Sequence, residues 1–178
     1  MDDAPASQPE PPRSPGLSCG LGIDVVDATG RLGADRIAWL IDGAGRVLAP
    51  LGLAGEVRVR VVDDVEMAEA HARWAGVEGT TDVLAFDLRD DPGGPLDTDV
   101  LACLDEAERQ AGERGHAPER ELLLYLVHAV LHCCGHDDHD EADAARMHAL
   151  EDELLERAGV GATFEASRPR GGRGGGQP

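Results

Sequence analysis

The chain has 178 residues, of which 42% are hydrophobic, and this length and composition are typical of one domain with a genuine core. No apolar run is long enough for a transmembrane helix, and because the start is acidic and rich in proline we expect no conventional secretion signal. The formal net charge is −19, and the 16 basic residues, all arginine, do not form the basic footprint that is usual for nucleic-acid binders.

The two ends of the chain differ in composition from its middle. Residues 1–17 are rich in proline, serine and acid, and residues 167–178 are rich in glycine and arginine, so we expect both segments to be disordered. The folded domain is expected at residues 18–160. Its cysteines form no C-x-x-C pair, and the adjacent Cys133 and Cys134 would be prone to oxidation outside a reducing compartment. We therefore expect a cytoplasmic protein.

Strands and helices alternate along this domain. In chain order we predict a strand at 21–26, a helix at 33–51, a strand at 56–62, a helix at 64–74, strands at 83–88 and 99–104, and helices at 105–114, 118–134 and 140–157. The helix at 33–51 is expected to be interrupted at Gly43 and Gly45. The helix at 64–74 is expected to be capped by Asp63 or Asp64.

This order of elements predicts an α+β fold class. The domain should hold one mixed, roughly four-stranded sheet, with the long helices packed on one of its faces. In the strand at 56–62, Arg58 and Arg60 alternate with valines, which indicates that one face of the sheet is exposed to water.

The segment that follows residue 127 carries a metal-ligand pattern. His128 and His132 are four residues apart on a predicted helix, so their side chains share one face and can bind the same ion. Gly135 can end the helix in a left-handed conformation and turn the chain back. The turn would bring a third ligand from the cluster at 136–139. Two imidazoles, a third ligand and a position open to water are typical of a catalytic zinc site.

Two other interpretations of these histidines, a chance pair and a zinc peptidase, depend on the residues around them. Histidines at helical spacing can also occur by chance, but this helix is apolar on all sides and therefore buried, and buried imidazoles need partners. Zinc peptidases of the H-E-x-x-H type place their general base directly after the first histidine. That position is Ala129, so a peptidase is only an alternative interpretation.

Three blocks of this sequence have the pattern of one known family. The segment 128–138, HAVLHCCGHDD, is similar to H-G-x-L-H-x-x-G-[Y/H]-D-H. The segment 79–86, GTTDVLAF, is similar to P-T-D-V-L-S-F, and the segment 98–103, TDVLAC, is similar to G-D-I-x-I-S. Together these blocks resemble the YbeY family of endoribonucleases, also called rRNA maturation factors. The resemblance extends from about residue 21 to about residue 157. It implies a zincin-like metal helix and a zinc-dependent endoribonuclease, specific for single strands, that matures small-subunit (16S) ribosomal RNA.

The chain departs from the family pattern at two positions. By spacing from His128 and His132, the third histidine of the family falls on Asp138, while a histidine stands one residue later. A carboxylate can replace an imidazole on zinc, so we predict Asp138 as the third ligand, with His139 as the alternative. The family arginine upstream of the second block falls on Ala75, so neither the phosphate clamp nor the general base is assigned.

Thr81 and Asp82 precede a predicted strand, and the resemblance places them beside the metal. Asp82 would orient a ligand histidine or accept a proton, and Thr81 would contact phosphate; both residues could instead only close a turn. We expect one Zn2+ per chain, ribosomal RNA or the small ribosomal subunit as partner, no DNA or membrane, and a monomer. A second alternative, from a different functional class, is a metal-stabilised ribosome assembly factor without catalysis.

Overall fold

The computed structural model describes residues 20–161, so the expectations for residues 1–17 and 167–178 lie outside the described residues. In chain order the elements are β1 (Leu21–Asp27), α1 (Gly33–Leu48), the 3-10 turn η1 (Ala49–Leu51), β2 (Gly55–Val62), α2 (Asp64–Trp74), β3 (Val83–Asp87), β4 (Leu96–Cys103), α3 (Leu104–Arg114), α4 (Pro118–Cys133) and α5 (Glu141–Arg157). Among these described helices, none has both the length and the apolar character needed to cross a membrane.

The four strands form one mixed sheet in the order β1-β2-β4-β3, which confirms the predicted fold class. β2 pairs in parallel with β1 and β4, and β3 runs antiparallel along β4. Val57, Val59 and Val61 of β2 are buried, whereas Arg58 and Arg60 point to the other face. The alternation of β2 therefore separates a covered face of the sheet from an open one.

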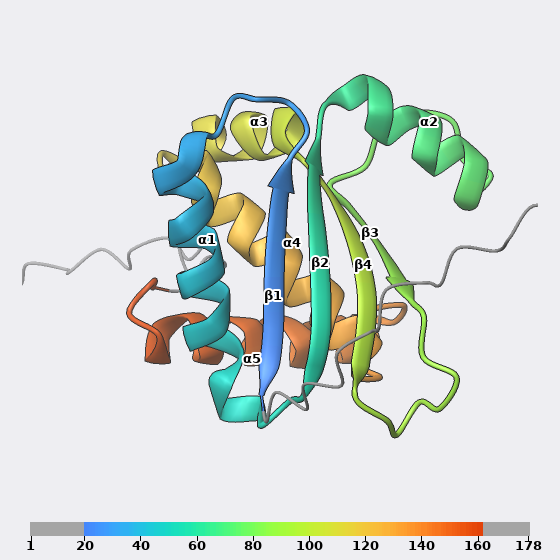
Figure 1. Cartoon of the computed structure of the whole chain (residues 1–178), viewed down its shortest axis with the longest axis vertical. Helices are drawn as coiled ribbons and strands as arrows, with labels where there is room; N and C mark the ends of the chain where they lie inside the picture. The colour runs from blue at the N-terminus through green and yellow to red at the C-terminus, as the bar shows by residue number, and fades with distance from the viewer. Residues whose placement is uncertain (1–19, 162–178) are drawn as a thin grey trace, which may run out of the picture.

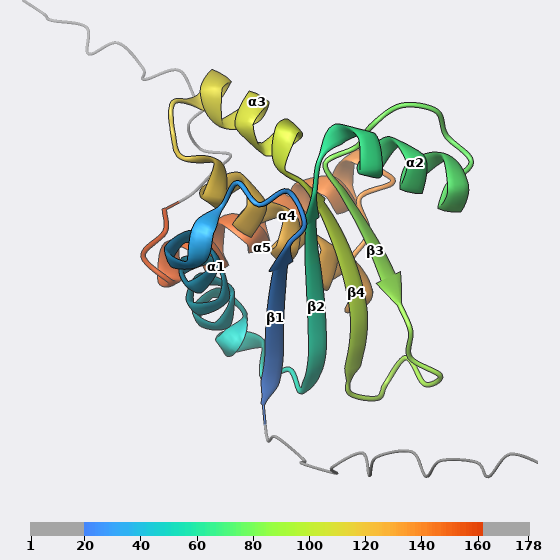
Figure 2. The same ribbon diagram turned by 45° about the horizontal axis from the view of Figure 1, so that its top comes forward.

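Helices α1, α4 and α5 cover one face of the sheet, while α2 and α3 lie at one end of it (Figures 1 and 2). α4 occupies the centre of this layer and contacts α1, α3, α5, β3 and β4. Its residues 121–127 and 129–131 are all buried. A helix that is apolar on nearly every side is stable only when it is enclosed, so the sequence of α4 fixes its central place.

Helix α1 differs from its prediction. It runs without interruption through Gly43 and Gly45, so the predicted break is wrong. Gly43 is buried, and a Cβ atom at this position would lie 3.3 Å from a methyl carbon of Leu123 on α4. The glycine lets the two helices approach closely, and this packing outweighs the low helix propensity of glycine.

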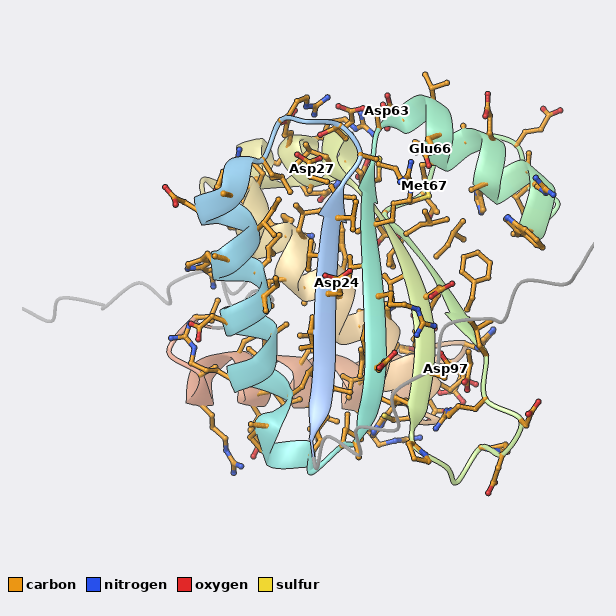
Figure 3. The ribbon with its side chains drawn as sticks, in the orientation of Figure 1. Asp24, Asp27, Asp63, Glu66, Met67 and Asp97 are labelled. Carbon is orange, nitrogen blue, oxygen red and sulfur yellow. The ribbon has the colours of Figure 1, made fainter. Side chains whose placement is uncertain are left out.

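The open face of the sheet carries alternating charges. Figure 3 shows Asp24 on β1 and Asp97 on β4 on the side that no helix covers. Between these strands, Arg58 contacts Asp97 at 2.5 Å and Asp99 at 2.6 Å. Such cross-strand pairs of opposite charge stabilise the pairing of β2 with β4 on the face that is exposed to water. The candidate site lies on the other side, where α4 packs.

Candidate metal centre

Three side chains converge at the end of α4. The Nε2 atoms of His128 and His132 are 3.0 Å apart. The carboxylate of Asp138, in the segment between α4 and α5, lies 3.6 Å from His128 Nε2 and 3.5 Å from His132 Nε2. The structure thus brings together the three residues that we predicted as ligands, and one donor atom of each lies within 4.8 Å of the others.

The backbone after α4 produces this convergence. The N–H of Gly135 donates to the carbonyl of His132 at 2.9 Å, and the N–H of His136 donates to the carbonyl of Leu131 at 3.1 Å. Gly135 has a φ of 88°, so this pair of hydrogen bonds is a Schellman motif with glycine in the left-handed position. The motif ends the helix and reverses the chain, and Asp138 therefore faces the two histidines.

The second ring nitrogen of each histidine is also held. His128 Nδ1 lies 2.8 Å from Glu151 Oε1, and His132 Nδ1 lies 3.0 Å from the carbonyl oxygen of His136. Both partners are acceptors, so they place the ring protons on the Nδ1 atoms and leave the Nε2 atoms available to a metal ion. We predicted that Asp82 would orient a histidine in this way, but Glu151 and a backbone carbonyl make these contacts.

Glu151 is the residue that the sequence reading missed. It is fully buried on α5, between Met147 and Leu154 on the apolar face of that helix. A carboxylate on an apolar helix face was the signal that could have identified it, because a buried acid needs a specific partner.

The electrostatics of His128 follow from these neighbours. Burial of the ring opposes its protonation, but the hydrogen bond to Glu151 and the charges of Glu151, Asp138 and Asp82 outweigh burial and raise the pKa of His128. Negative charge around an imidazole pair stabilises any cation held between the rings, whether a proton or a metal ion. The centre is thus prepared for a cation.

Thr81 and Asp82 lie in the cavity beside the histidines. This cavity has a volume of about 570 Å³, and its lining includes Thr81, Asp82, His128, Asp138 and Glu151. Asp82 Oδ1 accepts hydrogen bonds from Thr81 Oγ1 at 3.0 Å and from the N–H of Val83 at 2.8 Å. One oxygen of Asp82 therefore closes the turn before β3. Its other oxygen forms no hydrogen bond with the residues that the structure describes.

The alternative ligand His139 lies apart from this convergence. Its side chain is 86% exposed, and its ring nitrogen Nδ1 contacts the carboxylate of Asp137. Ala75, at the position of the family arginine, follows the last residue of α2 and is exposed. Arg73 stacks on Trp74 of the same helix, so neither residue lines the cavity.

The donor set fits zinc. For a tetrahedral ion with metal–ligand distances of about 2.0–2.1 Å, the ligand atoms stand about 3.3–3.4 Å apart. The two Nε2 atoms are 3.0 Å apart, and His128 Nε2 lies 3.6 Å from one carboxylate oxygen of Asp138 while His132 Nε2 lies 3.5 Å from the other. Two imidazole nitrogens at this distance can share a proton or bind one metal ion, because each can offer an Nε2 lone pair. These residues could therefore hold the ion with one position left facing the cavity.

Comparisons with known proteins match most of this chain. A family model described as Endoribonuclease YbeY matches residues 39–159. The chain is 40% identical over 129 residues to the Endoribonuclease YbeY of Anaeromyxobacter sp. (strain Fw109-5), covering 71% of this chain and 67% of that protein. It is also 40% identical over 138 residues to the Endoribonuclease YbeY of Moorella thermoacetica, covering 68% of this chain and 87% of that protein. Among solved structures, TM1509 from Thermotoga maritima matches with a TM-score of 0.56 at 22% identity, covering 85% of this chain and 99% of TM1509.

Proposed function

Because this chain belongs to the YbeY family of endoribonucleases, we propose that it hydrolyses phosphodiester bonds of single-stranded RNA with one zinc ion held by His128, His132 and Asp138. The observation that carries the proposal is the convergence of these three donors beside a cavity that His128 and Asp138 line. A zinc ion bound here would polarise a phosphoryl oxygen and make water more acidic.

The residues around the proposed ion have separate tasks. Glu151 and the carbonyl of His136 hold the two imidazoles in the orientation that metal binding requires. Asp82, whose second oxygen is not engaged, is our candidate for accepting the proton of the attacking water. Thr81 holds Asp82 in place through its hydroxyl. The position after His128 is Ala129, which is buried, so no carboxylate of the peptidase type stands there.

A recessed site favours a flexible strand as substrate. Two of the three donors, His128 and Asp138, line a cavity bordered by α3, α4 and α5, and a single strand can bring a phosphodiester into it more readily than a duplex can. We propose small-subunit ribosomal RNA as the natural substrate, on the resemblance to the rRNA maturation factors. The net charge of −19 is then compatible with binding to an assembled particle, whose proteins supply positive charge.

Cleavage of a fluorescent single-stranded RNA tests the proposal. The full chain is stripped of metal with a chelator, reloaded with zinc, and compared with His132→Ala and with the matched control His139→Ala. We expect cleavage by the zinc-loaded chain and by His139→Ala, and none by the stripped chain or by His132→Ala.

Duplex RNA and an unfolded protein serve as further substrates, and we expect both to remain intact. Undiminished cleavage by His132→Ala would refute the site. Failure of the zinc-loaded chain to cut any RNA would favour a metal-stabilised assembly factor, and digestion of the unfolded protein would favour a peptidase.

A further inference from the structure

The cavity has a second polar end, away from the histidines. Of the residues that line it, Arg114 at the end of α3 is the only lysine or arginine, and four carboxylates line it as well: Asp82, Glu106, Asp138 and Glu151. A cavity of this charge repels a polyanion unless cations compensate it. Arg114 therefore stands where an RNA strand needs a positive charge.

A buried carboxylate on α4 holds Arg114 in place. Its Nη1 atom donates to both carboxylate oxygens of Glu121, at 2.7 and 2.8 Å, and Glu121 is fully buried on α4. The Nε and Nη2 donors of Arg114 form no hydrogen bond with residues 20–161, and about a third of its side chain (34%) is exposed. A guanidinium anchored by one nitrogen keeps the other donors ready for a ligand, at a low entropic cost of binding.

Tyr125 lies between Arg114 and the histidines. It lines the cavity, its residue is 5% exposed, and its hydroxyl has no hydrogen-bond partner among residues 20–161. A buried hydroxyl without a partner is costly and rare, and it indicates a group that a ligand or water satisfies. Burial, together with the charges of Glu121, Asp82 and Glu106, raises the pKa of Tyr125, so the phenol remains a donor.

The spacing along α4 relates the two ends of the cavity. Glu121, Tyr125, His128 and His132 recur at intervals of four, three and four residues, so they form one polar stripe on this helix. With a rise of 1.5 Å per residue, Glu121 and His128 are about 10 Å apart along the axis. A single phosphate cannot bridge that distance, whereas neighbouring phosphates of one strand can.

We propose that Arg114 and Tyr125 form a phosphate-binding subsite that holds a phosphodiester next to the one placed at His128 and His132. This subsite rests on the proposed function, because it assumes that the cavity takes a polynucleotide. It places the missing phosphate contact on α3 and α4 rather than at Ala75. It also explains why a polar stripe crosses an otherwise apolar helix.

Tyr125→Phe separates binding from folding. The change removes only the hydroxyl, so a ligand-binding role predicts an unchanged or higher melting temperature together with about tenfold weaker binding of RNA. Binding is measured by fluorescence anisotropy on the zinc-loaded full chain with a 2′-O-methyl oligonucleotide, whose integrity is checked on a gel. A lower melting temperature with unchanged affinity would show a structural hydroxyl and overturn the role of Tyr125.

Arg114→Gln is compared with Arg46→Gln, an exposed arginine on α1 that pairs with Asp42 and does not line this cavity. Because Arg114→Gln leaves Glu121 buried without its main partner, Arg114→Lys is included to keep a charge there. We expect both Arg114 variants to bind RNA at least about tenfold more weakly than the wild type, and Arg46→Gln to bind within about twofold. An equal loss of RNA affinity in Arg114→Gln and Arg46→Gln would show that only the net charge of the protein matters, and it would overturn the subsite.

Oligonucleotides that carry one uncharged phosphate analogue show which phosphate of the strand is bound. A set of oligonucleotides, each with one methylphosphonate in place of one phosphate, should show a single position next to the cleavage site where the wild type loses affinity. In Tyr125→Phe and in Arg114→Lys the same methylphosphonate should reduce the RNA affinity clearly less, because the amino-acid substitution and the methylphosphonate remove the same interaction. A scan with no such position, combined with tight binding of inorganic phosphate, would assign the site to a free phosphate and overturn the strand subsite.

This test is independent of the cleavage test. If the zinc-loaded chain cuts RNA and the Arg114 and Tyr125 variants bind and cut it like the wild type, the subsite is wrong and the proposed function stands. If the chain cuts no RNA but the scan shows a single position whose loss of affinity is smaller in Tyr125→Phe and Arg114→Lys, the subsite stands and the enzymatic proposal is wrong.

Discussion

Replacing Glu151 by Gln tests how the metal centre is supported. The amide keeps the shape of the side chain but removes the charge that Oε1 of Glu151 presents to His128 Nδ1 at 2.8 Å. Loss of such an outer partner typically weakens metal binding by about 10- to 100-fold, which corresponds to about 1.4–2.7 kcal/mol. Because zinc stabilises the folded chain through its affinity, the melting temperature gained on adding zinc should be about 3–10 °C smaller in Glu151→Gln.

Zinc affinity is measured by competition with a chromophoric chelator. The matched control is Glu153→Gln, the same chemical change two residues along α5 at an exposed glutamate that pairs with Arg157. We expect the control to match the wild type, and Glu151→Gln to lose no further affinity when His128 is already Ala. Wild-type affinity in Glu151→Gln would refute the reasoning that a buried carboxylate supports the ligand.

The other predictions concern the third ligand, acid stability and a close strand contact. Asp138→Ala should weaken zinc binding by about tenfold or more and His139→Ala by less than about twofold; the opposite order in the chelator competition would reassign the ligand. The hydrogen bond from Arg109 lowers the pKa of Asp64 to about 2 from 3.8, so its stabilising effect is complete above about pH 4 and is lost as the pH falls toward 2. In urea denaturation at several pH values, the free energy of unfolding should therefore fall less between about pH 4 and pH 2 in Asp64→Asn than in the wild type. An equal fall in both proteins would contradict this assignment. Gly55→Ala should cost about 3 kcal/mol or more, because its φ is +119° and its Cβ would lie 2.1 Å from a backbone oxygen of β4; a denaturation midpoint equal to that of the wild type would disprove the contact.

The fold could be predicted from the sequence where burial imposes a period. The alternation in β2 and the apolar length of α4 gave the sheet with one open face and the central helix, and the structure confirms both. The pattern failed where one contact between distant residues decides the outcome. Gly43 suggests a break when α1 is considered alone, and only its packing against Leu123 shows why the helix continues.

The starts and ends of elements were less predictable than their existence. β4 begins at Leu96, three residues before the predicted start, because Asp97 and Thr98 continue the alternation of exposed and buried positions. Polar residues at the start of a strand conceal this alternation when the sequence is read for hydrophobicity. Of the two caps proposed for α2, the structure shows Asp63, whose side chain accepts the N–H of Glu66.

In the candidate site, too, the local features could be predicted from the sequence and the long-range contacts could not. The spacing of His128 and His132 and the turn at Gly135 are local features, so the sequence alone indicated the convergence that the structure shows. Glu151 and Arg114 reach the cavity from α5 and α3 through tertiary packing, and no spacing rule within α4 could have located them.

A crystal structure of the zinc-loaded chain, with anomalous scattering recorded at the zinc edge, tests the central claim most directly. Our account predicts one anomalous peak within about 2.0–2.2 Å of His128 Nε2, His132 Nε2 and an oxygen of Asp138, with the remaining position open to the cavity that Asp82 lines. A peak bound instead by Asp137 and His139, or an ion whose fourth position is closed by another protein side chain, would contradict it.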